Sequence, residues 1–474
     1  MKQKNLPVAV IGAGPVGLAA AAELILRGET PLVLEAGQGP GASIRKWAHV
    51  SMFSPWEFNT SKAAVALLAA SGWEAPTADA IPTGGDLIER YLEPLASLPA
   101  LRPHIRYGAR VTGVSRRGHD KVRTEGRTDE PFVLRVTTDR GDEEVIEARA
   151  VIDASGTWTA PNPAGADGLP APGELAAADR LSYGIPDVLG EARGRYAGKT
   201  VMVVGGGHSA INALIELGTL KRDFPATRIV WVTRKAHIET AYGGESADAL
   251  PARGALGIQA RELVERGAVE VLSPFRIARI ARAADGSLLV SGDHGGKERT
   301  LPAHEMIVAT GFRPDLSLLR EIRLTLDPWL ESSGEIGPLI DPNLHSCGTV
   351  RPHGAKELAH AEAGFFIIGM KSYGRAPTFL VATGHEQARS VVAHLTGDLE
   401  AAARVELELP ETGVCFSRPI GQTTEAAACC GPAPVGVDAC CDVDALAKAA
   451  GDAGCGCPPS KPELVATAAA CCTR

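Results

Sequence analysis

The chain carries two glycine-rich motifs of the kind that bind dinucleotides. The first, Gly12-Ala-Gly-Pro-Val-Gly17, follows the apolar stretch 7–11, and the second, Gly205-Gly-Gly-His-Ser-Ala210, follows the apolar stretch 200–204. In such a motif the first glycine allows a tight turn, the second lets backbone N–H groups approach a pyrophosphate, and the third position lets a helix pack against a strand. One motif alone is weak evidence, but two motifs predict two nucleotides bound side by side.

The residues after the first motif complete a strand–helix–strand unit. Residues 16–27 have the pattern of an amphipathic helix that ends at Gly28, and the second apolar stretch, 31–34, ends at Glu35. An acid about 20 residues after such a motif is placed to accept hydrogen bonds from both ribose hydroxyls. We therefore predict a dinucleotide site that is formed by Gly12, Gly14, Gly17 and Glu35.

The second motif differs at the position that corresponds to Glu35. A predicted helix continues to about Leu220, and the next predicted strand, 228–233, is followed by Arg234 and Lys235 instead of an acid. A carboxylate would repel a 2′-phosphate, whereas two cations attract it, so we predict NADPH rather than NADH. The alternative is that the two cations belong to an ordinary solvated loop. The predicted binding residues are Gly205, Gly207, Ser209, Ala210, Arg234 and Lys235.

Composition excludes several classes of function. The chain has 474 residues and a net charge of −8, so no basic surface indicates nucleic acid binding. Charges or glycines interrupt the apolar stretches before the ~20 residues that a membrane span needs. The N-terminus leads directly into the first apolar stretch, and we predict no signal peptide. We expect a soluble, cytoplasmic protein that binds neither nucleic acid nor membranes.

Over residues 5–397 the chain resembles the flavin-dependent monooxygenase-like oxidoreductases with two dinucleotide-binding domains. The resemblance rests on both glycine motifs, on Ala309-Thr-Gly311 and on Gly369-Met-Lys-Ser-Tyr-Gly-Arg-Ala-Pro, and within the group it is strongest to the branch associated with arsenic-resistance operons. It implies an α/β fold with two Rossmann-like domains, the first binding FAD and the second binding NADPH. The predicted limits are 1–160 and 305–397 for the FAD domain, 161–304 for the inserted NADPH domain, and 398–474 for a low-complexity tail.

The resemblance also implies roles for several turns. Strands that end near Gly156 and Gly311 would close the seam between the domains, and the strand that ends at Gly369 would meet the ribityl and pyrimidine parts of the flavin. Many relatives have an Asp after that last glycine, where this chain has Met370 and Lys371. Many relatives that insert or add oxygen also have a Phe-x-Gly-x-x-x-His signature, but residues 181–187 of this chain contain no His.

The segment 47–59 concentrates aromatic and polar residues soon after the first glycine motif. Such a segment could cover the reactive edge of the flavin and line a substrate pocket, or it could be a loop that only packs on the FAD domain. We predict Trp47 as a cofactor contact. The predicted polar groups near the flavin, our candidates for catalytic residues, are Arg45, His49, Asn59 and Lys371.

The predicted body of the protein contains a single cysteine, Cys347. None of the ten cysteines precedes Cys347, so a thiol pair within that body is not available to accept electrons. We expect electrons to pass to oxygen or to a small substrate, with a soft sulfur, nitrogen or trivalent arsenic atom taking up oxygen. The alternatives are a disulfide or thiol reductase that uses cysteines of the tail, and a flavoprotein that binds or senses As(III).

The tail has a pattern of paired cysteines. Adjacent residues have Cα atoms ~3.8 Å apart, closer than a relaxed disulfide usually needs, but vicinal thiolates chelate soft ions well. We predict that the tail binds As(III) or a related soft metal; zinc, copper(I), an electron relay or no function remain alternatives. A homodimer is also left open. The predicted ligands are Cys429, Cys430, Cys440, Cys441, Cys455, Cys457, Cys471 and Cys472.

Overall fold

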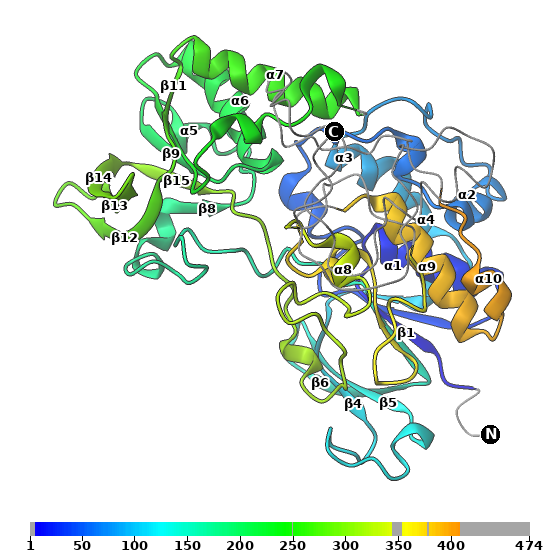
Figure 1. The fold of residues 1–474 in the computed structure, drawn as a ribbon. Coiled ribbons are helices and arrows are strands. Elements are labelled where there is room, and N and C mark those ends of the chain that lie inside the picture. The colour runs from blue at the N-terminus through cyan, green and yellow to red at the C-terminus, as the bar shows by residue number, and fades with distance from the viewer. Residues whose placement is uncertain (1–4, 249, 344–352, 377–378, 408–474) are drawn as a thin grey trace, which may run out of the picture. The chain divides into compact units, whose positions relative to one another are not determined.

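The computed structural model describes residues 5–248, 250–343, 353–376 and 379–407 (Figure 1). A parallel sheet of five buried or half-buried strands contains the first glycine motif. Its strand order is β16-β7-β1-β2-β3. The strands are β1 (Val8–Ile11), β2 (Pro31–Leu34), β3 (Ile105–Arg106), β7 (Ala150–Asp153) and β16 (Phe365–Ile367). Strand β7 therefore pairs with β16, which lies more than 200 residues later in the chain.

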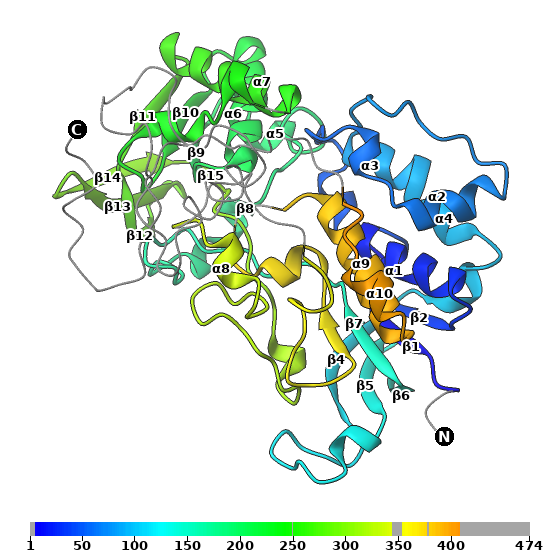
Figure 2. The same cartoon turned by 45° about the vertical axis from the view of Figure 1, so that its right-hand side comes forward.

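The two faces of this first sheet bury alternate residues of the same strands. Val8 and Val10 pack with helices α1 (Pro15–Leu26) and α9 (Val381–Leu395), whereas Ala9 and Ile11 pack with a small antiparallel sheet. That sheet consists of β4 (Ala109–Arg116), β5 (Phe132–Thr138) and β6 (Glu143–Ala148). Both views show α1 and α9 side by side (Figures 1 and 2).

Helix α1 ends as its sequence predicts. Gly28 has φ +74°, and its N–H donates to the carbonyl of Ile25 while the N–H of Glu29 donates to the carbonyl of Leu24. This pair of bonds is the Schellman arrangement, which favours glycine because the turn needs a left-handed residue. The turn then directs the chain into β2.

A second parallel sheet has the strand order β11-β10-β9-β15-β8 and contains the second glycine motif. Its strands are β8 (Leu181–Tyr183), β9 (Thr200–Val204), β10 (Arg228–Val232), β11 (Val269–Leu272) and β15 (Glu305–Val308). Helices α6 (His208–Asp223) and α7 (Pro251–Glu265) pack on one face. On the other face lie β12 (Arg276–Arg282), β13 (Leu288–His294) and β14 (Lys297–Ala303). Each glycine motif is therefore held in the same three-layer arrangement.

Strand β15 lies in the second sheet, because it pairs with β9 and β8. The chain thus returns to the first sheet after β15, whereas the predicted second segment of the FAD domain begins at residue 305. The remaining short helices of the described residues are α2 (Lys62–Ala69), α3 (Gly84–Leu87), α4 (Glu93–Ser97), α5 (Arg193–Tyr196), α8 (Gly337–Ile340) and α10 (Leu399–Ala403). Among the described residues, no helix combines the length and apolar character that crossing a membrane requires.

Two chain segments that connect the sheets run beside each other. Pro161 forms a β-bridge with Phe312, and the N–H of Asn162 donates to the carbonyl of Gly311 at 2.9 Å. The rings of Trp158 and Phe312 stack with their centroids 4.7 Å apart. The outgoing and returning segments therefore support each other where the chain passes between the sheets.

Candidate dinucleotide-binding sites

The first glycine motif has the backbone geometry that its sequence predicts. Gly12 has φ +102°, and a Cβ there would lie 2.8 Å from the carbonyl oxygen of Ala154. A Cβ on Gly17 would lie 2.0 Å from the carbonyl oxygen of Gly12. A Cβ on Gly14, in contrast, would meet nothing within 4 Å. Gly12 and Gly17 are thus required for packing, while Gly14 leaves the start of α1 open.

The start of α1 is suited to an anion. Its N-cap, Gly14, offers no side-chain cap, and the first turn contains no acidic residue. The first N–H groups of a helix need acceptors, and a pyrophosphate supplies them. Glu35 lies beside this point: its carboxylate accepts hydrogen bonds from the N–H groups of Ala13 and Gly37, both at 2.7 Å. The carboxylate is therefore held in place and retains lone pairs for ribose hydroxyls.

The strand order gives the direction in which a dinucleotide would extend. Glu35 ends β2 on one side of β1, whereas β7 and β16 lie on the other side. With one ribose at Glu35 and the pyrophosphate at α1, the second half of a bound dinucleotide would lie over the carboxyl ends of β7 and β16. The predicted glycines are there: Gly156 has φ +70°, and Gly369 has φ +72° and packs against Val16 of α1.

The second glycine motif repeats this geometry. Gly205 has φ +128°, and a Cβ there would lie 2.3 Å from the carbonyl oxygen of Ala309. A Cβ on Gly207 would meet nothing within 4 Å, and Gly207 is the N-cap of α6 without a side-chain cap. Ser209 lies in the first turn of α6, and Ala210 is buried. Gly311, which has φ +89°, follows β15 at the same edge of the sheet. The motif thus has the shape that a second dinucleotide needs.

Arg234 and Lys235 follow β10 and are exposed. The guanidinium of Arg234 makes only a long hydrogen bond of 3.4 Å, to the carbonyl of Ala166, and the N–H of Lys235 donates to Thr233 Oγ1 at 3.2 Å. Within the described residues neither side chain forms an ion pair. Both cations are therefore available to a 2′-phosphate at the position where the first site has Glu35.

The aromatic segment after β2 contacts the second glycine motif. The Phe53 ring lies 5.3 Å from the ring of His208, the first residue of α6, and His49 Nε2 lies 3.9 Å from Glu216 Oε1. Burial, together with the charge of Asp187, raises the pKa of Glu216 to about 7. Burial lowers the pKa of His208. Segment 47–59 thus also contacts helix α6, which follows the second glycine motif.

Two of the four predicted polar groups are not available to a substrate. A group that touches a bound molecule must present surface to it, but Asn59 is 0 % exposed and its amide donates to the carbonyls of Ser54 and Pro55. Lys371 is 1 % exposed and donates to Asp153. The prediction that these two side chains contact the substrate is corrected. Asn59 forms hydrogen bonds within its own loop, and Lys371 forms a buried ion pair with Asp153.

The other predicted residues of this region lie near the surface. Arg45 is roughly half exposed and pairs with Glu93 at 2.6 Å, beside the loop that contains Gly39. Trp47 is partly exposed and its ring lies directly over Gly84. Trp47, Arg45 and His49 stay predictions as cofactor or substrate contacts.

Sequence reasoning missed three polar residues near the first site. Asp153, at the end of β7, receives the Lys371 ammonium, and Gln387 of α9 accepts a hydrogen bond from the N–H of Gly369 at 2.7 Å. His385 is buried, and burial lowers its pKa to about 4, so the ring is neutral at pH 7. Asp153 could have been noticed as a polar residue that ends an apolar strand. Nothing in the helical pattern distinguishes Gln387 or His385.

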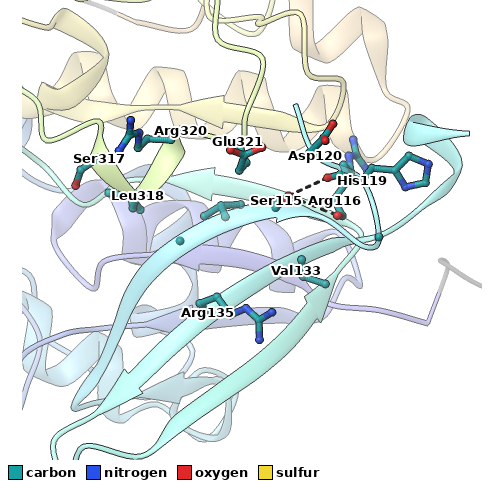
Figure 3. A pocket seen from close by; sticks show the side chains of 13 residues that line it. Ser115, Arg116, His119, Asp120, Val133, Arg135, Ser317, Leu318, Arg320 and Glu321 are labelled. Carbon is teal, nitrogen blue, oxygen red and sulfur yellow. Dashed lines mark hydrogen bonds between the residues drawn. The ribbon is translucent and has the colours of Figure 1, made fainter. Parts of the chain in front are cut away.

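Two surface cavities of about 460 Å³ are lined by none of the predicted site residues. The cavity in Figure 3 lies on β4 and β5, with residues 317–321 at its edge. The eight predicted tail ligands lie outside the described residues, as does Cys347. Among the residues that the structure describes, no cluster of three or more His, Cys, Asp or Glu could hold a metal ion.

Comparisons with known proteins agree with this geometry. The family model of the pyridine nucleotide-disulphide oxidoreductases matches residues 9–333. A ferredoxin–NADP reductase from Rhodospirillum rubrum is 25% identical over 390 residues, which is 82% of this chain and 89% of that protein.

Solved structures show the same fold at low sequence identity. The bacillithiol disulfide reductase of Bacillus cereus superposes with a TM-score of 0.62 at 18% identity, over 83% of this chain and 99% of that chain. The FAD-bound cadaverine monooxygenase of desferrioxamine biosynthesis from Erwinia amylovora gives a TM-score of 0.59 at 14% identity, over 86% and 98%. The predicted α/β fold with two Rossmann-like units is confirmed.

The residues at both motifs fit the two cofactors that this family uses. The open start of α1 with Glu35 suits FAD, and the open start of α6 suits a nicotinamide dinucleotide. The protein is an oxidoreductase that uses FAD and NAD(P)H. The chain belongs to the pyridine nucleotide-disulphide oxidoreductase family.

Proposed function

We propose that the protein is an NADPH-dependent flavin monooxygenase that acts on a small molecule with a soft nucleophilic atom. The observation that carries the proposal is the absence of cysteine before residue 347. All turns of the two dinucleotide sites precede that residue, except the turn at Gly369, which also has no cysteine. A thiol pair on these turns is thus not available to take electrons, and molecular oxygen is the acceptor.

Each part of the two sites has a separate task in this proposal. When bound, FAD supplies hydride acceptance from NADPH and the activation of oxygen. Glu35 orients one ribose, Arg234 and Lys235 attract the 2′-phosphate of NADPH, and the segment 47–59 excludes water from the flavin edge. Of the four predicted polar groups, His49 and Arg45 are the two that retain exposed surface.

Trivalent arsenicals are the substrate class that we propose. Trivalent arsenic is a soft nucleophile that can take up an oxygen atom, and vicinal thiolates bind it well. The three vicinal cysteine pairs and Cys455-Gly-Cys457 of the tail would capture As(III). This part of the proposal rests on the sequence alone.

A second candidate function is electron transfer to a protein or thiol acceptor. The similarity to a ferredoxin–NADP reductase over 89% of that protein favours an acceptor of this kind. Tail cysteines that act as a disulfide would serve the same purpose. A flavoprotein that only binds or senses As(III) is a third function.

Oxygen uptake and NADPH oxidation by the full chain distinguish these functions. A monooxygenase consumes both, faster when arsenite or an organic thioether is added, and little hydrogen peroxide forms. Turnover that continues without oxygen, with a disulfide or a ferredoxin as acceptor, would contradict the proposal. A variant with all eight tail cysteines changed to Ser should raise the KM for arsenite and leave thioether-dependent turnover unchanged. Arsenite that binds without any effect on NADPH oxidation would indicate a sensor.

A further inference from the structure

A buried ion pair joins two turns that border the first dinucleotide site. Lys371 Nζ donates to Asp153 Oδ2 at 2.7 Å and to Ser155 Oγ at 3.1 Å, and Ser155 Oγ donates to Asp153 Oδ1 at 2.6 Å. The side chains of Lys371 and Asp153 are 1 % and 0 % exposed. Asp153 ends β7, and Lys371 lies in the turn that follows β16. The pair thus connects the carboxyl ends of two neighbouring strands.

Both turns touch the first glycine motif directly. The carbonyl oxygen of Ala154 lies 2.8 Å from the position of a Cβ on Gly12, and the N–H of Ala154 donates to the carbonyl of Ile11. Gly369 packs against the side chain of Val16 at 3.4 Å from the corresponding Cβ position. A shift of either turn would therefore move residues that the second half of a bound FAD would contact.

Ser155 is the member of this group that faces outward. It is exposed, while the two charges beneath it are not. Asp315 is a further charged group near Lys371: a hydrogen bond from Ser317, and to a smaller degree the Lys371 ammonium, lower the pKa of Asp315. Lys371 thus acts on a bound molecule only through Asp153, Ser155 and the backbone of its own turn.

A buried ion pair such as Lys371 and Asp153 need not make the folded protein more stable. The desolvation of two charges can cancel their attraction, and an apolar pair of similar volume is often equally stable. What the ion pair adds is a fixed distance between two turns, because a charged pair has a narrow range of favourable geometries.

We propose that Lys371 is a positioning residue for FAD, which holds the turns 153–156 and 369–373 at the separation that the flavin end requires. The inference rests on the occupation of the first site by FAD, which is part of the proposed function. Its test needs no turnover, so that it can fail separately from the proposed monooxygenase activity.

Three full-length variants test the proposal: Lys371→Met, the double variant Lys371→Met with Asp153→Asn, and Arg127→Met. The Asn still accepts the hydrogen bond that the N–H of Ser155 donates to Asp153 Oδ1 at 3.0 Å. Arg127 forms a buried ion pair with Glu362 at 2.7 Å, and Glu362 also pairs with Arg116 of β4, so Arg127→Met controls for the loss of a buried charge pair elsewhere. The measurements are the dissociation constant of FAD from the apoprotein, the midpoint potential of the bound flavin and the thermal unfolding of the apoprotein.

We expect Lys371→Met to unfold at lower temperature, to bind FAD roughly 10-fold more weakly or worse, and to shift the flavin potential. The double variant should recover most of the apoprotein stability, because no unpaired charge remains, and should keep the weak FAD binding and the shifted potential. Arg127→Met should lose stability only. A double variant that regains normal FAD affinity and potential together with its stability would overturn the proposal, and this variant decides the matter even if Lys371→Met does not fold.

Discussion

The two dinucleotide sites share a backbone and differ in charge. In each, a parallel strand ends in a left-handed glycine, an uncapped helix begins at a second glycine, and the neighbouring strand ends beside that helix. At the end of that neighbouring strand the first site has the buried carboxylate of Glu35, and the second has the exposed cations Arg234 and Lys235. The backbone thus determines that a dinucleotide binds, and one or two side chains determine which one.

The third position of the motif also differs between the sites. Gly17 has the carbonyl of Gly12 at 2.0 Å from its Cβ position, whereas the second motif already has Ala210, buried in α6. The first motif therefore has no room for a methyl group at the position where the second motif has one. We therefore predict that an added methyl group at the third motif position harms the first site, whereas removal of the methyl group from the second site does little harm.

The largest effect should come from Gly17→Ala. The added methyl group must push α1 away from β1, at a cost of about 2–3 kcal/mol, which corresponds to roughly 30–150-fold weaker FAD binding. The measurement is the FAD content of the purified variant and its FAD dissociation constant. Ala210→Gly is the matched control, which should cost only about 1 kcal/mol of stability and keep NADPH-dependent reduction. If Gly17→Ala binds FAD normally, just as Ala210→Gly keeps NADPH-dependent reduction, the proposed difference between the two sites is wrong.

A smaller effect is expected from the double variant Arg234→Ser with Lys235→Ser. Loss of two charge-assisted contacts to a 2′-phosphate should raise the KM for NADPH about 10–100-fold, since each contact is worth about 1.5 kcal/mol or less at an exposed site. The KM for NADH, which has no 2′-phosphate, should stay unchanged. Steady-state kinetics with both cofactors measure the ratio. If both KM values rise together, the two cations belong to an ordinary solvated loop.

The smallest effect concerns Glu216 of α6, a half-buried acid. Burial raises its pKa to about 7 from the ordinary value of 4.5, so the folded protein binds the proton more tightly than the unfolded chain. The stability that this group contributes is present below pH 4.5 and is lost as the pH rises toward 7. Glu216→Gln should therefore raise stability by about 1–2 kcal/mol at pH 8 and change little at pH 4.5. Thermal unfolding at both pH values is the measurement, and a gain of the same size at pH 4.5 would contradict this explanation.

Local patterns predicted much of the fold. The strand 31–34, the end of α1 at Gly28 and both glycine turns follow from short-range rules, because hydrophobic alternation and left-handed glycines act within a few residues. The sequence did not indicate that β15 joins the second sheet, because only the pairing with β9 shows this. The domain limits themselves stay a prediction.

The candidate site was harder to predict than the fold. Asn59 and Lys371 have the polar character of substrate contacts, but their partners, Ser54 and Asp153, take up their hydrogen bonds inside the protein. Whether a polar side chain faces inward or outward depends on tertiary packing, which no local pattern reports. Glu35, in contrast, was found because its distance from the glycine motif is fixed by one strand–helix–strand unit.

An anaerobic titration of the purified full chain with NADPH tests the central claim most directly. The purified protein should carry bound flavin, and one equivalent of NADPH should bleach the visible absorption bands of that flavin. The bands should return when oxygen is admitted. A protein without flavin absorption, or a bound flavin that NADPH does not bleach, would contradict the account.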